Sequence, residues 1–177
     1  ERFHMYNKPE SRLTQKRVDV FISYAMGDKG VADAVTKRLE EQNIQCWVAH
    51  RYENLLPGTD NWLHAIQGAI RRSKIFLIII SSASAGSKWV QTELNAATVL
   101  GKTIVPFTIE MGVELNDVFK AEIGYVQGLQ SSNPPTVDDL DRLCAATKRH
   151  VKHRDWLKRG LKTWVKAAIS AAVVLTG

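Results

Sequence analysis

Apolar residues in this chain fall into short runs that are separated by segments of a different periodicity. Residues 75–80 are apolar at every position, which is typical of a strand covered on both faces in a parallel sheet. Shorter apolar runs predict further strands at 19–24, 44–48 and 103–107, and a short edge strand at 125–127.

Between these runs, apolar residues recur every three to four positions, as they do on one face of a helix. Asp28 is placed to cap the first such segment, and Gly101 follows the third, where a helix can end. The spacing of apolar residues in 110–124 is less regular. The predicted helices lie around residues 31–39 and 62–70, and at 89–100 and 137–151.

Strands and helices thus alternate about five times along the chain. This alternation predicts an α/β fold, a doubly wound sheet of about five parallel strands flanked by helices. Ligands of such sheets bind outside the carboxyl ends of the strands, at the point where the strand order reverses. The loops that this rule brings together are residues 24–29, 49–61 and 81–88.

The basic residues are concentrated near the carboxyl end of the chain. Residues 142–166 hold nine Lys and Arg and one acid, a local charge of +8, whereas all 177 residues together carry +6. The remainder of the chain therefore carries a net −2. A basic tail on a near-neutral domain argues against a nucleic-acid-binding fold, so we expect no nucleic-acid partner.

The composition also limits the kind of site to expect. The chain is 45% hydrophobic and 24% charged, as ordinary globular proteins are. Its two cysteines and five histidines form no ligand cluster beyond a weak His150 and His153 pair. We therefore expect no bound metal and a reducing, cytoplasmic setting.

Three segments are predicted: a polar leader at 1–17, part of which can be a tag, a domain at 18–151, and a basic, then apolar helical segment at 152–177. Residues 167–175 are apolar, but nine residues are too few for a bilayer, which takes about twenty. Two interpretations stay open. The sequence beyond residue 166 begins a membrane segment on the inner face of a membrane, or it is an amphipathic helix that packs on protein.

The segment 87–94 carries the strongest candidate chemistry. Trp89 and Glu93 are four residues apart near the start of a predicted helix, so both side chains lie on one face. A flat aromatic ring beside a carboxylate can hold a planar heterocycle and stabilise a cation. The alternative is that Trp89 is a packing anchor and Glu93 a solvated helix residue.

Six short motifs follow one another around the predicted strand ends. Together they resemble the Toll/interleukin-1 receptor (TIR) domain family, in its bacterial form, over about residues 19–130. The motifs are residues 19–25 with Asp28, residues 46–49 with Arg51, Pro57-Gly58 with Trp62 and Ala65-Ile66, residues 73–82, residues 87–94, and Gly101-Lys102 with residues 104–106.

The resemblance implies a flavodoxin-like fold and an activity. Many bacterial and plant members of this family cleave NAD+ between nicotinamide and ribose, and some close the product into cyclic ADP-ribose or a variant of it. NAD+ would be a substrate, and no cofactor is implied. The catalytic carboxylate of the family corresponds to Glu93. Loss of nicotinamide leaves an oxocarbenium-like ribose, whose charge a nearby carboxylate stabilises.

The resemblance also implies partners and further site residues. Homo-oligomerisation with other TIR domains is expected, and a role in bacterial antiphage defence or signalling. Trp89 would form a wall of the pocket, and Arg51 would meet a phosphate or a neighbouring subunit. The residues expected to contact substrate are Tyr24, Ala25, Met26, Trp47, Arg51 and Trp89.

The loop at 50–60 departs from the family pattern. Many bacterial members carry Arg-Asp where this chain has Arg51-Tyr52, and Glu53 is a candidate replacement for the missing acid. A second hypothesis is a TIR scaffold that recruits other TIR domains without chemistry. A third is another flavodoxin-like protein, such as a nucleoside deoxyribosyltransferase or a phosphoacceptor receiver. A receiver needs acidic residues at the ends of its strands, whereas Asp19 lies at the start of its strand, so a receiver fits poorly.

Overall fold

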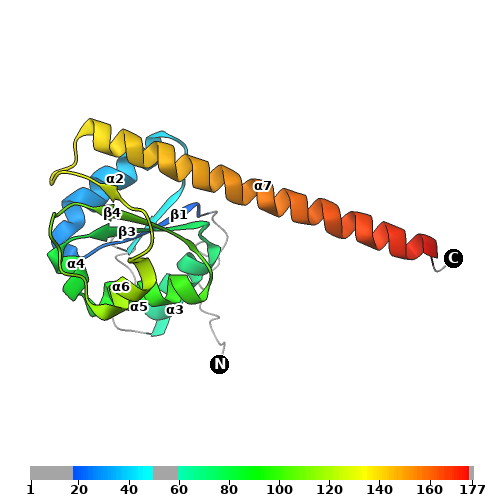
Figure 1. Ribbon diagram of the computed structural model, residues 1–177, viewed down its shortest axis with the longest axis horizontal. Helices are drawn as coiled ribbons and strands as arrows, with labels where there is room; N and C mark the ends of the chain where they lie inside the picture. Colours follow the sequence, from blue (N-terminus) through cyan, green and yellow to red (C-terminus); the bar gives the residue numbers. More distant parts are fainter. Residues whose placement is uncertain (1–17, 50–59, 176–177) are drawn as a thin grey trace, which may run out of the picture.

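Five parallel strands form one sheet at the centre of the structure, a computed structural model that describes residues 18–49 and 60–175 (Figure 1). The strands lie in the order β2-β1-β3-β4-β5, and each neighbouring pair is parallel. This is the predicted flavodoxin-like arrangement. The strands are β1 (Val20–Ser23), β2 (Cys46–Val48), β3 (Ile75–Ile80), β4 (Thr103–Thr108) and β5 (Leu129–Gln130).

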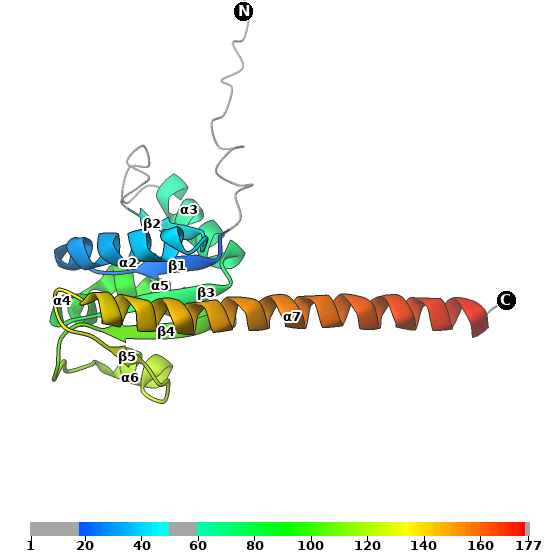
Figure 2. The same ribbon diagram turned by 90° about the horizontal axis from the view of Figure 1, so that it is seen from above.

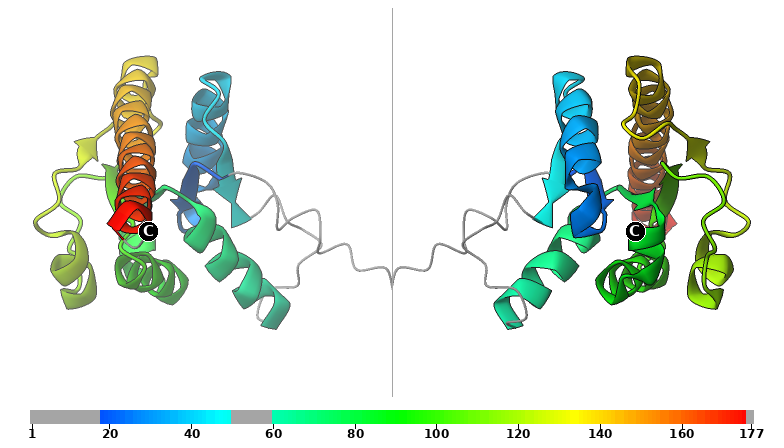
Figure 3. Two further views of the ribbon diagram at one scale, coloured as in Figure 1. Left: turned by 90° about the vertical axis from the view of Figure 1, so that its right-hand side faces the viewer. Right: turned by 90° about the vertical axis from the view of Figure 1, so that its left-hand side faces the viewer.

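Helices cover both faces of this sheet (Figures 2 and 3). One face carries α2 (Lys29–Glu41) and α7 (Val137–Leu175), which run side by side. The other face carries α3 (Asp60–Arg72), α5 (Lys88–Val99) and α6 (Asp117–Ile123). Two short helices, η1 (Met26–Asp28) and α4 (Ser82–Gly86), follow the carboxyl ends of β1 and β3.

The core lies in two layers, one on each face of the sheet. All six residues of β3 are buried, as their uniform apolar character predicts. Alternate residues of a strand face opposite sides, so Ile75, Leu77 and Ile79 pack under α2 and α7. Phe76, Ile78 and Ile80 pack under α3 and α5.

Helix α7 is one continuous helix of 39 residues, so the prediction that it ends near residue 151 was wrong. Its first half packs on the sheet through the buried Leu143, Cys144 and Val151. Its second half projects well beyond the domain (Figures 1 and 2). The Lys and Arg of this part are good helix formers, and they continue the helix past the packed region. Within the described ranges, no helix has an apolar stretch long enough to cross a bilayer.

In residues 110–130 the predicted edge strand was misplaced, and helix α6 was not predicted. The edge strand is Leu129–Gln130 rather than residues 125–127. Helix α6 begins where the Asn116 side chain accepts a hydrogen bond from the Phe119 backbone N–H at 3.1 Å. Phe119 and Ile123, four residues apart on this helix, are buried. A single capping residue and one apolar pair are too short a pattern to predict a helix from the sequence.

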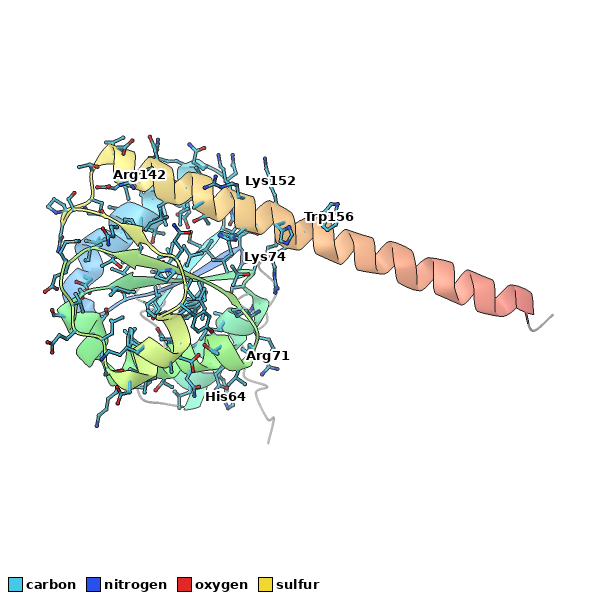
Figure 4. All side chains as sticks on the ribbon, in the orientation of Figure 1. His64, Arg71, Lys74, Arg142, Lys152 and Trp156 are labelled. Atoms are coloured by element: carbon cyan, nitrogen blue, oxygen red, sulfur yellow. The ribbon has the colours of Figure 1, made fainter. Side chains whose placement is uncertain are left out.

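A buried ion cluster fixes α7 at the amino edge of the sheet. Lys74 Nζ lies 2.9 Å from the buried Asp19 and 2.7 Å from Asp155 of α7. Figure 4 shows Lys74 below α7, where the helix leaves the domain. Asp19 precedes β1 and Lys74 precedes β3, so the cluster joins the starts of two central strands to α7.

We predict that Lys74→Met lowers the free energy of unfolding by about 3 kcal/mol, because it removes the ammonium that two carboxylates face in a buried setting. The matched control is Lys29→Met, which breaks the exposed pair with Asp33 and should cost under about 1 kcal/mol. Urea unfolding monitored by circular dichroism measures both. Equal losses in the two variants would contradict a stabilising role for the cluster.

Candidate functional site

The candidate site lies at the carboxyl edge of the sheet, between β1 and β3. From these two adjacent strands the chain continues to β2 on one side and β4 on the other, so the strand order reverses here. The segments that follow them meet: the Ser81 hydroxyl donates a 2.6 Å hydrogen bond to the Asp28 carboxylate. The structure thus brings two of the predicted loops together.

Glu93 is one of two acids buried at this edge, the other being Asp28. It lies in the second turn of α5, and only 8% of its surface is exposed. Ser23, the last residue of β1, donates a 2.6 Å hydrogen bond from its hydroxyl to Glu93 Oε2. Ser23 shares a strand face with Phe21, which packs under α3 and α5, and this brings the hydroxyl to the helix. In the part of the chain that the structure describes, Glu93 Oε1 has no hydrogen-bond partner.

The Glu93 carboxyl is easier to protonate than an ordinary glutamate. Burial raises its pKa from 4.5 to about 7, although the Ser23 hydrogen bond pulls the pKa down. Near neutral pH, both protonation states are therefore populated. A carboxyl with this pKa can stabilise a developing cation when ionised, or exchange a proton with a reacting group.

Helix α5 is fixed in place by its own start and by its buried face. The Ser87 side chain caps it by accepting from the Val90 backbone N–H at 3.4 Å. Val90 and Leu94 point into the core. Glu93 precedes Leu94 and lies at the border of this buried face, so the helix delivers its carboxyl to the end of β1.

Trp89 lies one turn before Glu93 on the same helix face, as predicted. It is 49% exposed, so it is not the core packing anchor of the alternative interpretation. An exposed indole beside a buried carboxyl leaves an aromatic surface available at this edge. The solvated-residue interpretation of Glu93 was wrong as well, since Glu93 is buried.

Of the other residues expected to contact substrate, only some lie at this edge. Ala25 is buried two residues after the end of β1, and Met26 is 73% exposed in η1, so both border the edge. Tyr24 is half-buried and packs against the core under α2 and α7, on the other side of β1 from Ser23. Arg51, with the loop around it, lies outside the described residues.

Trp47 does not reach the site. It is 4% exposed, and its ring stacks on Phe21 with centroids 4.7 Å apart. Phe21 stacks in turn on Phe76 at 5.4 Å. This placement corrects the expectation that Trp47 contacts substrate, because strand alternation turns its ring into the aromatic core beside Phe21.

Sequence reasoning missed two polar contacts of this edge, from Ser23 to Glu93 and from Ser81 to Asp28. Ser23 ends the first strand but was not recognised as a partner of Glu93, which is 70 residues away. Asp28 occupies the cap position of α2, yet its side chain makes no capping bond and accepts from Ser81 instead. A serine at the end of a strand was the available signal. Over the described ranges, no group of three His, Cys, Asp or Glu residues could hold a metal.

Comparisons with known proteins show the family and the fold of the chain. A family model described as TIR domain matches residues 20–144. Among solved structures, the TIR domain of the Toll-related receptor TRR-2 from Hydra magnipapillata is 22% identical, with a TM-score of 0.52, covering 64% of this chain and 83% of that one.

Two further structures share the fold. A metazoan TIR-STING receptor from C. gigas is 23% identical, with a TM-score of 0.56, covering 72% of this chain and 38% of its own. The CMP N-glycosidase BcmB of Clostridium botulinum is 16% identical, with a TM-score of 0.53, covering 71% and 96%. No curated protein matches the chain.

The raised pKa of Glu93 makes a prediction about stability. A carboxyl whose pKa is higher in the folded state than in the unfolded state favours folding when protonated. Its stabilisation is complete below pH 4.5 and is lost as the pH rises to about 7. Glu93→Gln mimics the protonated form, so at pH 8 the variant should be more stable than the wild type by roughly 3 kcal/mol. The difference should vanish near pH 4.

Urea unfolding at several pH values measures this difference. Glu110→Gln is the control, because the hydroxyl and backbone N–H of Ser82 lower the pKa of Glu110, so that this substitution should instead destabilise above that pKa. If Glu93→Gln is less stable than the wild type at pH 8, the ionised carboxyl does not destabilise the folded protein, and its pKa is not raised.

Proposed function

The chain belongs to the TIR domain family, and from this premise we propose that it is an NAD+ nucleosidase, which cleaves the bond between nicotinamide and ribose. The observation that carries the proposal is the buried Glu93 carboxyl at the carboxyl end of β1, with a pKa near neutral. It corresponds to the catalytic carboxylate of the family that the sequence resembles. NAD+ is then a substrate, and no cofactor or metal is proposed.

The chemistry needs little more than this carboxylate. The bond from ribose C1′ to the nicotinamide nitrogen breaks, and its electron pair goes to that nitrogen, which becomes neutral. Positive charge develops on the ribose, and the ionised Glu93 stabilises it at close range in a site of low polarity. Because the leaving group is already cationic, no general acid has to protonate it.

Two products are compatible with this step. Water can attack C1′ and release a proton, which gives ADP-ribose. A nitrogen of the adenine of the same molecule can attack instead, which gives a cyclic ADP-ribose. The described residues do not favour one nucleophile, so the proposal covers hydrolase and cyclase activity alike.

The residues around Glu93 have proposed roles in binding. The exposed indole of Trp89 offers a flat surface to the nicotinamide or the ribose. Ala25 has a small side chain, which lets a ligand approach the backbone at the end of β1, and the exposed Met26 borders the nucleotide. A role for Arg51 at a phosphate or at a subunit contact stays a proposal, since it lies outside the described residues.

A nucleotide N-glycosidase of this fold supports the class of reaction. The CMP N-glycosidase acts on a glycosidic bond to a nucleobase, by its name, and its sheet resembles this one. The bond in NAD+ is of the same kind, since it joins a ribose carbon to a ring nitrogen.

The competing proposal is a TIR scaffold that assembles with other TIR domains and does no chemistry. The burial of Glu93 favours the enzyme. A buried carboxyl with a raised pKa destabilises the folded protein at neutral pH, and a scaffold gains nothing from it. Self-assembly remains part of the proposed enzyme, because related TIR domains are expected to build shared sites. A role in bacterial antiphage defence rests on the resemblance alone.

We predict that concentrated wild-type protein releases nicotinamide from NAD+, and that Glu93→Gln lowers this rate by at least about a hundredfold, because it removes the charge that stabilises the ribose cation. The control Glu41→Gln, an exposed residue at the end of α2, should keep the wild-type rate. Chromatography of the products measures the rate and separates ADP-ribose from its cyclic form.

The outcomes separate the proposals. A silent wild type, also under crowding that favours assembly, supports the scaffold. An active wild type whose Glu93→Gln variant is equally active keeps the enzyme and contradicts this site.

A further inference from the structure

We propose that Ser23 is a positioning residue for Glu93: its hydroxyl holds one carboxylate oxygen, Oε2, so that the other, Oε1, faces the substrate ribose. The inference rests on the proposed function, because it assigns the ribose as the group that Oε1 meets. It adds a second residue to the site, at the end of strand β1, to which neither the sequence pattern nor the comparisons give a role.

The geometry makes Ser23 a rigid support. It is the last residue of β1, paired in register with Ile78 of β3, and it is 1% exposed. Its Oγ lies 2.6 Å from Glu93 Oε2, a short bond of the kind that hydroxyls form with carboxylates. A side chain with one torsion angle on a central strand has little freedom to move, so it fixes the carboxylate it holds.

Glu93 depends on this bond for its orientation. The cap and the buried face of α5 fix the helix backbone, but three torsion angles of the glutamate side chain remain. Among the described residues, Ser23 is the sole hydrogen-bond partner of the Glu93 carboxyl. Without it, the carboxyl has no described group to select one rotamer or to present Oε1.

The neighbouring Ser81 shows what a structural serine looks like at the same edge. Ser81 also donates a 2.6 Å hydrogen bond to a buried carboxylate, that of Asp28. However, its Oγ additionally accepts from the Ser84 backbone N–H and closes the capping box of α4. In the described part of the chain, the Ser23 hydroxyl makes no bond other than that to Glu93. Its hydroxyl is therefore dedicated to the carboxylate.

The bond also favours the charged form of the carboxylate. A hydrogen bond to an ionised carboxylate stabilises that form, and here it opposes the effect of burial. The ionised form is the one that stabilises the ribose cation. Loss of the hydroxyl therefore leaves both a misplaced carboxylate and a smaller ionised fraction at neutral pH.

The test compares Ser23→Ala, Ser23→Thr and the control Ser73→Ala by the pH dependence of kcat/KM for NAD+. Ser73 is buried like Ser23, but its hydroxyl donates to the Ile70 carbonyl at the opposite edge of the sheet. In the wild type, kcat/KM should fall below about pH 7, as Glu93 becomes protonated. In Ser23→Ala the midpoint should move up by about one pH unit, and kcat should fall at least tenfold even where Glu93 is ionised.

Conservative substitution should rescue the effect. Ser23→Thr keeps the hydroxyl and should keep the wild-type midpoint, and Ser73→Ala should keep it as well. If Ser23→Ala does not fold, Ser23→Cys replaces the hydroxyl by a weaker donor of similar size and should shift the midpoint in the same direction. An unchanged midpoint and kcat in a folded Ser23 variant that lacks the hydroxyl overturns the proposal.

A second arm needs no activity. Carbon-13 NMR of the Glu93 side-chain carboxyl, assigned by its loss in Glu93→Gln, reports the titration directly in each variant. A wild type that releases no nicotinamide contradicts the proposed function, whereas an upward shift of this titration in Ser23→Ala still supports the Ser23 interaction. An active wild type with the same titration in Ser23→Ala contradicts the inference alone.

Discussion

The short hydrogen bond between Ser23 and Glu93 is the interaction on which the candidate site depends. It joins the end of a central strand to the second turn of a helix and holds a carboxyl where few water molecules reach it. Burial alone would keep this carboxyl protonated, whereas full exposure would let water weaken its electrostatic interaction with a cation. The intermediate state, with a pKa of about 7, is what a carboxylate needs in order to meet a transient cation at neutral pH.

The amino and carboxyl ends of β1 and β3 have different roles: one end stabilises the fold and the other carries the candidate site. At the amino edge, Lys74 and two aspartates join the strand starts to α7, and this arrangement serves stability. At the carboxyl edge, Ser23 and Ser81 hold one carboxylate each, one on either side of the sheet. A parallel sheet gathers all strand ends of one kind on a single edge, so a site assembled there can vary while the opposite edge keeps the strands in register.

The sequence predicted those parts of the molecule in which pattern and burial coincide. The uniformly apolar residues 75–80 form the central strand β3, and the alternation of strands and helices was enough to predict that the strands are parallel. Glu93 and Trp89 were predicted as neighbours because their spacing fixes this locally. The hydrogen bond from Ser23 to Glu93 could not be predicted, because the two residues are 70 positions apart and meet only through the way α5 packs on the end of β1. Trp47 was wrongly expected at the site because its position in the core follows from its contact with Phe21 on the neighbouring strand. The end of α7 was wrongly placed because the basic stretch does not show where the helix stops packing on the domain.

The most direct measurement is the number of protons released when a non-cleavable, carbocyclic analogue of NAD+ binds at pH 7, obtained by calorimetry in buffers of different ionisation enthalpy. A cationic ring beside a carboxyl of pKa about 7 should drive it to the ionised form, so about half a proton should leave per site. NADH, whose nicotinamide ring is neutral, and the Glu93→Gln variant should release almost none. Binding of the analogue with no proton release, or with the same release from Glu93→Gln, would show that the substrate cation does not meet Glu93.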